Sequence, residues 1–158
     1  MSDRTGYSRL QIALHWLVAI LIVAAWFTHE GMEDALEARI ETGLLSPNPH
    51  AILGLAVFVL VLVRIVVRGM HGAPGPLPGA SPLMEAAATW GHRLLYALMI
   101  LTPIGGAITW FGGIEAVGEG HELLGNLLMI VAFGHALLAI FHQVVLRDGA
   151  MTRMIRPR

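Results

Sequence analysis

The sequence predicts an all-α integral membrane protein, a bundle of four membrane-spanning helices with both termini in the cytoplasm. Hydrophobic residues make up 56% of the 158 residues and charged residues only 13%, whereas a soluble domain carries about 25% charged residues. Four apolar stretches are also long enough to cross a hydrocarbon core of about 30 Å, which takes roughly 20 helical residues. A soluble enzyme is therefore excluded, and membrane lipid is the expected surroundings of most of the surface.

The apolar stretches define the predicted spans. One domain is expected over residues 1–158, with helices at about 10–28, 50–68, 92–111 and 121–146. Pro103 and the Gly105-Gly106 pair are expected to kink the third helix. The Gly/Pro-rich residues 69–82 are predicted to be a non-helical linker, and residues 32–42 a short acidic helix. The first stretch is too long for the apolar region of a signal peptide and lacks a small-x-small cleavage site after it, so it is expected to remain as a span.

The arginines predict the orientation. Nine of the ten fall at one end of the predicted bundle: Arg4, Arg9, Arg64, Arg68, Arg93, Arg147, Arg153, Arg156 and Arg158. At the other end, residues 29–49 and 112–122 are acidic and contain Arg39 as their only arginine. Because arginine-rich loops stay in the cytoplasm, we expect a multi-pass protein of the bacterial inner membrane with its acidic end outside.

The chain contains no cysteine. This excludes disulfides, covalently attached c-type haem, cysteine-ligated iron–sulfur clusters and thiol catalysis. The formal net charge is −1, so the overall charge points to no particular partner, and no nucleic-acid partner is expected.

The histidines inside the spans are the candidate functional residues, because ionisable groups are costly in a membrane. His121 and His135 are 14 residues apart, which corresponds to about 21 Å along a helix and to directions within about 40° of each other. Two histidines on one face at different depths suit two stacked cofactors rather than one metal ion, whose ligands must converge.

Depth matching supplies a partner for each of these histidines. His50 opens the second span at the level of His121, and His15 lies about 20 Å further inward, near the level of His135. The pairs His50/His121 and His15/His135 are thus predicted to be the axial ligands of two b-type haems, which need no covalent attachment. A helix–helix hydrogen bond is the alternative for any one of these histidines, and spacing alone leaves His142 as a rival of His135 for His15.

Small and basic residues lie beside these pairs. Gly54 and Gly125 each follow a predicted ligand by four residues, where a flat macrocycle must approach the backbone closely. Arg64 lies near the depth of the inner pair and is a candidate partner for a haem propionate. Snorkelling to the interface is the alternative for Arg64 and the expectation for Arg68.

Further polar residues lie near the cytoplasmic ends of the spans. His92 and His142 either form an inner polar site, a candidate quinone site together with Arg9, or lie among the lipid headgroups. Four tryptophans near the span ends are expected to be interfacial anchors: Trp16, Trp26, Trp90 and Trp110.

Taken together, these residues resemble the prokaryotic cytochrome b561 family of small four-helix di-haem membrane cytochromes. The resemblance covers almost the whole chain and lies in Tyr7-Ser8-Arg9-Leu10-Gln11-Ile12 with His15-Trp16, His50-x-x-x-Gly54, Arg64 with Arg68, Gly91-His92 with Tyr96, and His121-Glu122 with His135 and His142. It implies that His15 and His135 ligate one haem and that His50 and His121 ligate the other. It also implies electron transfer between the outer face and the membrane quinone pool, and one family member oxidises superoxide and reduces ubiquinone.

The charge of the outer end bears on the electron donor. A site that collects superoxide should be surrounded by positive charge, which steers an anion, but the outer segments are acidic. They favour a cationic periplasmic redox protein instead. We therefore expect transmembrane electron transfer to a quinone, as an oxidoreductase of the superoxide oxidase or quinone reductase type. The alternatives are a cytochrome b membrane-anchor subunit between a periplasmic redox protein and quinone, and a haem-free transporter with a histidine proton relay.

Overall fold

The structure, a computed structural model, describes residues 6–77 and 79–157. Its elements in chain order are α1 (Arg9–Phe27), α2 (Met32–Thr42), α3 (Pro49–His71), α4 (Pro82–Gly112), α5 (Glu115–Phe141), the π-helical turn η1 (His142–Leu146) and the short 3-10 helix η2 (Thr152–Met154). Four of the helices, α1, α3, α4 and α5, are long and apolar enough to cross a membrane. The predicted membrane helical bundle is thereby confirmed.

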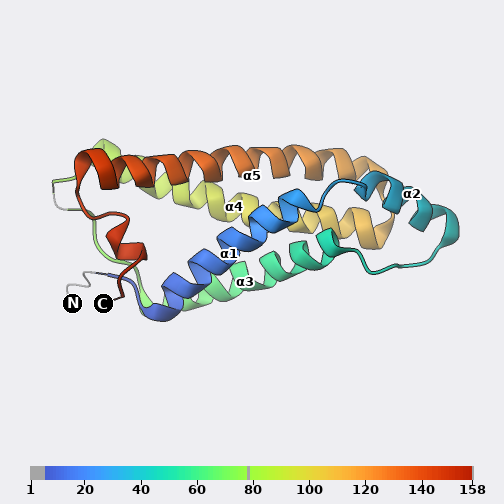
Figure 1. The fold of residues 1–158 in the computed structure, drawn as a ribbon, viewed down its shortest axis with the longest axis horizontal. Helices are drawn as coiled ribbons and strands as arrows, with labels where there is room; N and C mark the ends of the chain where they lie inside the picture. Colours follow the sequence, from blue (N-terminus) through green and yellow to red (C-terminus); the bar gives the residue numbers. More distant parts are fainter. Residues whose placement is uncertain (1–5, 78, 158) are drawn as a thin grey trace.

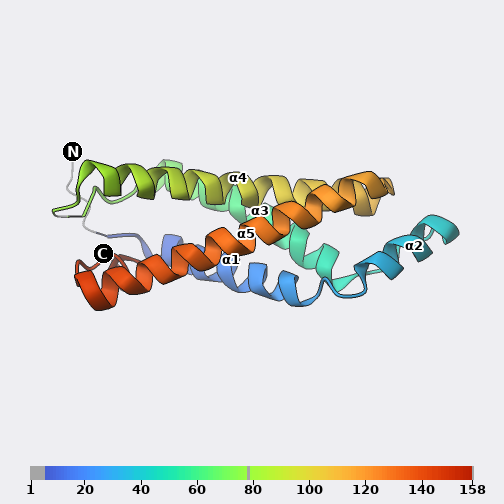
Figure 2. The ribbon, with the colours of Figure 1, turned by 90° about the horizontal axis from the view of Figure 1, so that it is seen from above.

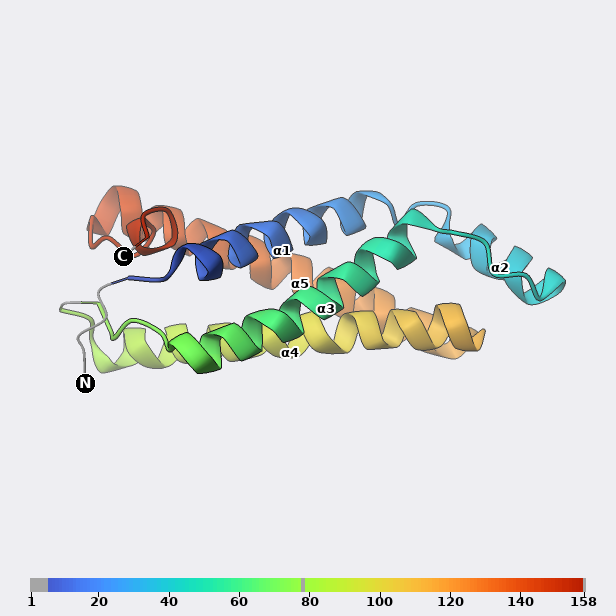
Figure 3. The same cartoon turned by 90° about the horizontal axis from the view of Figure 1, so that it is seen from below.

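The four long helices form an elongated bundle (Figure 1). The start of α1 and the C-terminal segment lie at one end, called the inner end, and α2 projects from the other, called the outer end. Helix α4 packs along α5, and α1 packs along α3. Helix α3 also packs on α4, and Figures 2 and 3 show that it passes from the side of α1 at the outer end to the side of α4 at the inner end.

The buried core of the bundle is thin. It consists of one cluster with members from all four long helices: Val18, Val57, Val61, Leu98, Met99 and Leu128. Much larger side chains lie on the outside, where Phe27 is 77% exposed and Phe133 is 66% exposed. Lipid is as apolar as these side chains, so packing between helices, rather than burial of the largest residues, holds such a bundle together.

Side-chain caps set the helix ends. The Ser8 hydroxyl accepts from the Gln11 N–H, and the Gln11 side chain in turn accepts from the Ser8 N–H at 2.9 Å, which forms a capping box at the start of α1. The Gln11 side-chain amide donates to the Gly72 carbonyl at 2.8 Å and so ties the start of α1 to the end of α3. The Asn48 side chain caps α3 by accepting from the N–H groups of its first turn.

Several predicted helix boundaries are wrong. Helix α4 begins at Pro82 rather than near residue 92, α5 begins at Glu115 rather than near 121, and α3 continues to His71, into the predicted linker. The apolar pattern marks only the part of a helix that crosses lipid, whereas the cap at Ser81 and the proline after it set the start of α4. The short acidic helix at residues 32–42 is confirmed as α2.

Two other expectations from the sequence concern a kink at Pro103 and the arginines that predict the orientation. Helix α4 continues without interruption through Pro103. Arg4 and Arg158, which contribute to the predicted orientation, lie outside the described residues.

We predict that shortening Val61 destabilises the bundle. Val61 is fully buried, whereas Val66 on the same helix is 58% exposed. The Val61→Ala variant should lose about 1–2 kcal/mol through the cavity it leaves and melt at a lower temperature in detergent. Val66→Ala should melt like the wild type, and equal losses in the two variants would contradict the core assignment.

Candidate functional site

Two histidines meet at the outer end of the bundle. His50 is the second residue of α3, and His121 lies in the second turn of α5. Their ring centroids are 5.8 Å apart with the planes at 79°. The Asn48 side chain fixes the start of α3 by accepting from the His50 N–H at 2.9 Å. The structure therefore brings together the outer pair that depth matching predicts.

Backbone carbonyls hold both outer rings. Nδ1 of His50 donates to the Ala25 carbonyl of α1 at 2.9 Å, and Nδ1 of His121 donates to the Thr102 carbonyl of α4 at 2.8 Å. Ala25 is in the last turn of α1, and its carbonyl also accepts from the N–H and the hydroxyl of Thr28, the C-cap residue. A neutral imidazole with its proton on Nδ1 has its lone pair on Nε2. Both outer rings can therefore bind a metal through Nε2, and a carbonyl partner on the other nitrogen is the usual arrangement of a ligating histidine.

Glycines of α4 make room for His121. A Cβ added at Gly106 would lie 2.8 Å from Cε1 of His121, and one at Gly105 would lie 3.5 Å from its Cβ. From the sequence, this glycine pair is expected only to bend the helix, and its role beside the ring was missed. The signal that could have revealed it is depth, because the pair lies at the outer end of its span, as His121 does.

The glycines one turn from the outer ligands also leave space. A Cβ at Gly54 would meet no other atom within 4 Å, and one at Gly125 would meet only Thr102, at 3.9 Å. That a macrocycle lies against these two glycines stays a prediction.

Three histidines gather nearer the inner end. The ring of His135 on α5 lies 6.4 Å from that of His15 on α1 and 5.2 Å from that of His92 on α4, measured between centroids. The expected neighbours His15 and His135 are thus brought together. His92 joins them, and its Nδ1 donates to the Ala88 carbonyl one turn earlier in α4.

Arg64 contacts this inner cluster directly. Its Nη1 lies 3.0 Å from Nδ1 of His15, and its guanidinium carbon lies 5.8 Å from the centre of the Tyr96 ring. Arginine can only donate, so Nδ1 of His15 accepts and the proton of that ring is on Nε2. His15 therefore binds a metal through Nε2 only after Arg64 releases Nδ1.

A small recess adjoins the cluster at the inner end. Its walls come from the start of α1, from α3, from Tyr96 and from the C-terminal segment; the lining residues are Tyr7, Gln11, Leu14, Arg64, Val67, Arg68, Tyr96 and Met154. The indole of Trp16 donates to the Met154 carbonyl at 2.9 Å, and Arg153 donates to the Gly75 carbonyl at 2.7 Å. The C-terminal segment thus folds back over the inner end of the bundle. This contact was not predicted from the sequence of the segment.

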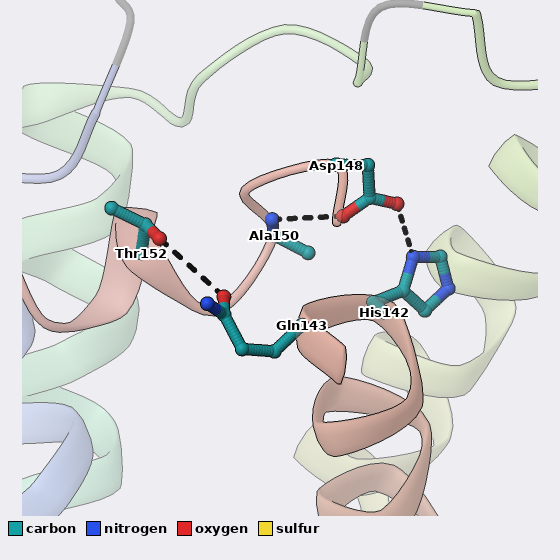
Figure 4. A network of polar contacts seen from close by, with 5 residues as sticks. All are labelled: His142, Gln143, Asp148, Ala150 and Thr152. Carbon is teal, nitrogen blue, oxygen red and sulfur yellow. Dashed lines mark hydrogen bonds and ion pairs between the residues drawn. The ribbon is translucent and has the colours of Figure 1, made fainter. Parts of the chain in front are cut away.

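His142 and Arg9 are not part of the cluster of three histidines. His142 donates through Nδ1 to Asp148 at 2.5 Å, in the turn that follows α5 (Figure 4). Partial desolvation raises the pKa of Asp148, but the hydrogen bonds from His142 and from the Ala150 N–H outweigh it and hold that pKa below its ordinary value. Arg9 is the first residue of α1 and is exposed.

One of the expected tryptophan anchors is in the interior. Trp110 is only 4% exposed. The guanidinium of Arg39 lies 6.0 Å from the centre of its ring and donates to the Phe111 carbonyl at 2.7 Å. Arg39 thus ties α2 to the end of α4.

Comparison with known proteins identifies the family. The family model of prokaryotic cytochrome b561 matches residues 6–157. The chain belongs to the prokaryotic cytochrome b561 family. A cytochrome b562 of Cereibacter sphaeroides is 40% identical over the full length of both chains. A probable superoxide oxidase CybB of Yersinia pestis is 30% identical over 94% of this chain and 95% of its own, and a cytochrome b561 homolog 2 of Escherichia coli is 24% identical over 94% and 90%.

Family membership gives the general activity. This cytochrome b561 family member is a bacterial multi-pass membrane protein that binds haem b and transfers electrons across the membrane. Haem b is held through axial protein ligands. With metal–nitrogen bonds of about 2 Å, as in zinc–imidazole sites, two axial rings have centroids about 6 Å apart.

The outer pair fits haem b in spacing and in the nitrogen that it leaves free. The inner pair His15/His135 fits in spacing only, because Arg64 engages the nitrogen of His15 that must carry the proton when Nε2 binds iron.

We predict that Gly106→Ala lowers the haem content and that Gly105→Ala does not. The Cβ at position 106 would press on the far edge of the His121 ring, which its bond to Thr102 holds in place, whereas the Cβ at position 105 would make an ordinary contact. The measurement is haem per chain after purification, by the pyridine haemochrome spectrum. Full haem content in Gly106→Ala would show that the ring position matters little.

Proposed function

We propose that the chain carries electrons from a donor at the outer face to a membrane quinone through two b-type haems. One haem is assigned to His50 and His121 and the other to His15 and His135. The observation that supports this most is the presence of two imidazole pairs at separate levels, with centroid distances of 5.8 Å and 6.4 Å. Haem supplies reversible one-electron transfer when bound.

The proposed orientation places the inner end in the cytoplasm and the protein in the inner membrane. Five described arginines support it, because they lie in the inner halves of α3 and α4 or after the last span: Arg68, Arg93, Arg147, Arg153 and Arg156. Helix α2 with its acidic residues projects from the opposite end of the bundle (Figure 1), which the proposal assigns to the periplasmic side.

The residues of this chain define the kind of transfer. His50 with His121, and His15 with His135, would each hold one haem through two imidazoles, and a haem so held would supply outer-sphere electron transfer, without the donor binding the metal. Arg64 is the candidate partner of a propionate at the inner site. An anion that draws Arg64 away from His15 would also free Nδ1 of that ring to take the proton, so that Nε2 could ligate.

The inner end is the proposed quinone site. A quinone takes up two electrons and two protons to become a quinol, so a titratable group is needed beside it. His92 is the candidate closest to the inner pair, at 5.2 Å from His135 between centroids. His142 and Arg9 are further candidates, with His142 next to Asp148 at the cytoplasmic edge.

The donor is proposed from charge. The Yersinia relative is named a probable superoxide oxidase, and superoxide as donor would lose one electron to become dioxygen. Against this, α2 carries Glu33, Asp34, Glu37 and Glu41, and Arg39 is bound to the α4 end rather than free. A cationic periplasmic redox protein suits this surface better, in which case the chain acts as a membrane-anchor cytochrome.

We predict that His50→Ala and His121→Ala each remove one haem of two. The inner pair should stay intact in both variants because it lies at a different level. The haemochrome spectrum should therefore give two haems in the wild type, one in each variant, and two in the control His29→Ala, which changes an exposed residue between α1 and α2. Loss of all haem from both variants would contradict separate sites, and a haem-free wild type would contradict electron transfer altogether.

We predict that quinone reduction driven by a superoxide source is slow at low salt and rises as salt is added. Salt screens the repulsion between the acidic outer end and the anion. A fast rate at low salt that falls with salt would instead support superoxide as the donor.

A further inference from the structure

A groove lies between α3 and α4 toward the inner end of the bundle. Its walls are Ile65, Arg68 and Gly69 of α3 and Tyr96 of α4, and its volume is about 460 Å³. This volume is within the range of roughly 300–1,000 Å³ that is typical of ligand pockets. Figure 3 shows α3 beside α4 at this end, after it has crossed over from the side of α1. None of the four lining residues belongs to the histidine pairs.

One side of the groove is apolar and open. Ile65 is 39% exposed, and Gly69, one turn further along α3, has no side chain. A Cβ added at Gly69 would meet no other atom within 4 Å. The space beside this glycine is therefore not filled by the rest of the protein, and an apolar chain can lie in it.

Arg68 places a positive charge in the same groove. It is half-buried in the last turn of α3, where it lines both this groove and the recess next to α1. In the described parts of the chain the one ion pair joins His142 and Asp148, so no carboxylate lies within 4 Å of the Arg68 guanidinium. A charged side chain within a membrane span calls for a partner of opposite charge.

The neighbouring part of α4 marks the depth of the groove. Arg93, three residues before Tyr96, is exposed, and its guanidinium carbon lies 4.8 Å from the centre of the Trp90 ring. Trp90 is itself 65% exposed. Exposed tryptophan next to arginine is typical of the level of the lipid headgroups. Arg68 is thus close to the level at which phosphates of the surrounding lipid lie.

We propose that this groove binds phosphatidylglycerol, with the lipid phosphate on Arg68 and one acyl chain along Ile65 and Gly69. Guanidinium groups bind phosphate oxygens through paired hydrogen bonds, and basic pockets between membrane-spanning helices bind anionic headgroups. Phosphatidylcholine has the same phosphate but adds a cation of its own, so the charge of Arg68 favours the anionic lipid. The proposal concerns binding only and does not rest on the proposed electron transfer.

The test is the retention of phosphatidylglycerol by the purified, haem-loaded protein in detergent, measured by native mass spectrometry. The wild type should retain one phosphatidylglycerol per chain and prefer it to phosphatidylcholine supplied at the same concentration. Arg68→Gln should lower this retention several-fold. The matched control Arg156→Gln removes an equal charge from an exposed residue of the C-terminal segment at the same end and should retain the lipid like the wild type. Equal losses in the two variants would show only a general attraction of this end for anionic lipid and would overturn the site.

A second variant fills the groove and leaves every charge in place. Gly69→Leu should fold, because the space beside this glycine is open, and should lower the retention of phosphatidylglycerol by occupying that space. Its control is Val66→Leu, which enlarges a side chain that is 58% exposed on the same helix and should retain the lipid. Unchanged retention in Gly69→Leu would overturn the proposal.

Two further outcomes would assign the groove differently. The haem content of each variant is measured as well, because Arg68 also lines the recess near the inner histidines. If Arg68→Gln loses haem together with the lipid, Gly69→Leu decides, since lipid loss with full haem content supports the proposal and full lipid retention overturns it. Displacement of the lipid from the wild type by a short-chain quinone would make the groove a quinone site and would also overturn the proposal.

Discussion

Two backbone carbonyl oxygens, those of Ala25 and Thr102, hold the outer histidines in place, and the rest of the site depends on that. An imidazole inside a membrane has no water to satisfy its N–H group, so it turns to whatever acceptor the helices offer. Helix α1 offers a carbonyl from its last turn and α4 offers one beside its glycine pair. The two rings themselves stand on α3 and α5, so all four spans are needed to present two free Nε2 atoms at one level.

The polar contacts at the inner end differ from those at the outer end. Its three histidines and Arg64 form a polar cluster in which a cation, rather than a carbonyl, faces His15. The bundle accommodates both polar levels because its apolar core is a thin layer from four helices, dominated by valine, leucine and methionine, while the larger side chains face outward into lipid. The apolar residues thus fix the distance between the helices, and the polar residues determine which polar groups face one another between them.

The four spans and the proximity of the histidines within each pair could be predicted from the sequence. Membrane thickness and helical rise together constrain the length of a span and the depth of each residue in it. A helix must be about 20 residues long to cross, and a 14-residue spacing must return to one face. The starts of α4 and α5 were missed because they lie outside lipid, where caps such as Ser81 decide and hydropathy does not. Residue spacing also does not determine side-chain rotamers or which backbone groups lie beside a ring. For this reason the carbonyl partners of the outer rings and the contact of Arg64 with His15 could not be predicted. Trp110 was misassigned for a related reason, since its position near a span end resembles that of an anchor although α2 covers it through Arg39.

Anomalous scattering of iron from crystals of the haem-loaded protein would locate each metal relative to the histidines that are proposed to bind it. We expect two iron peaks at two levels of the bundle, one between the Nε2 atoms of His50 and His121 and one between His15 and His135. A single peak, or an inner iron between His92 and His135 with His15 still bonded to Arg64, would contradict the two-haem assignment.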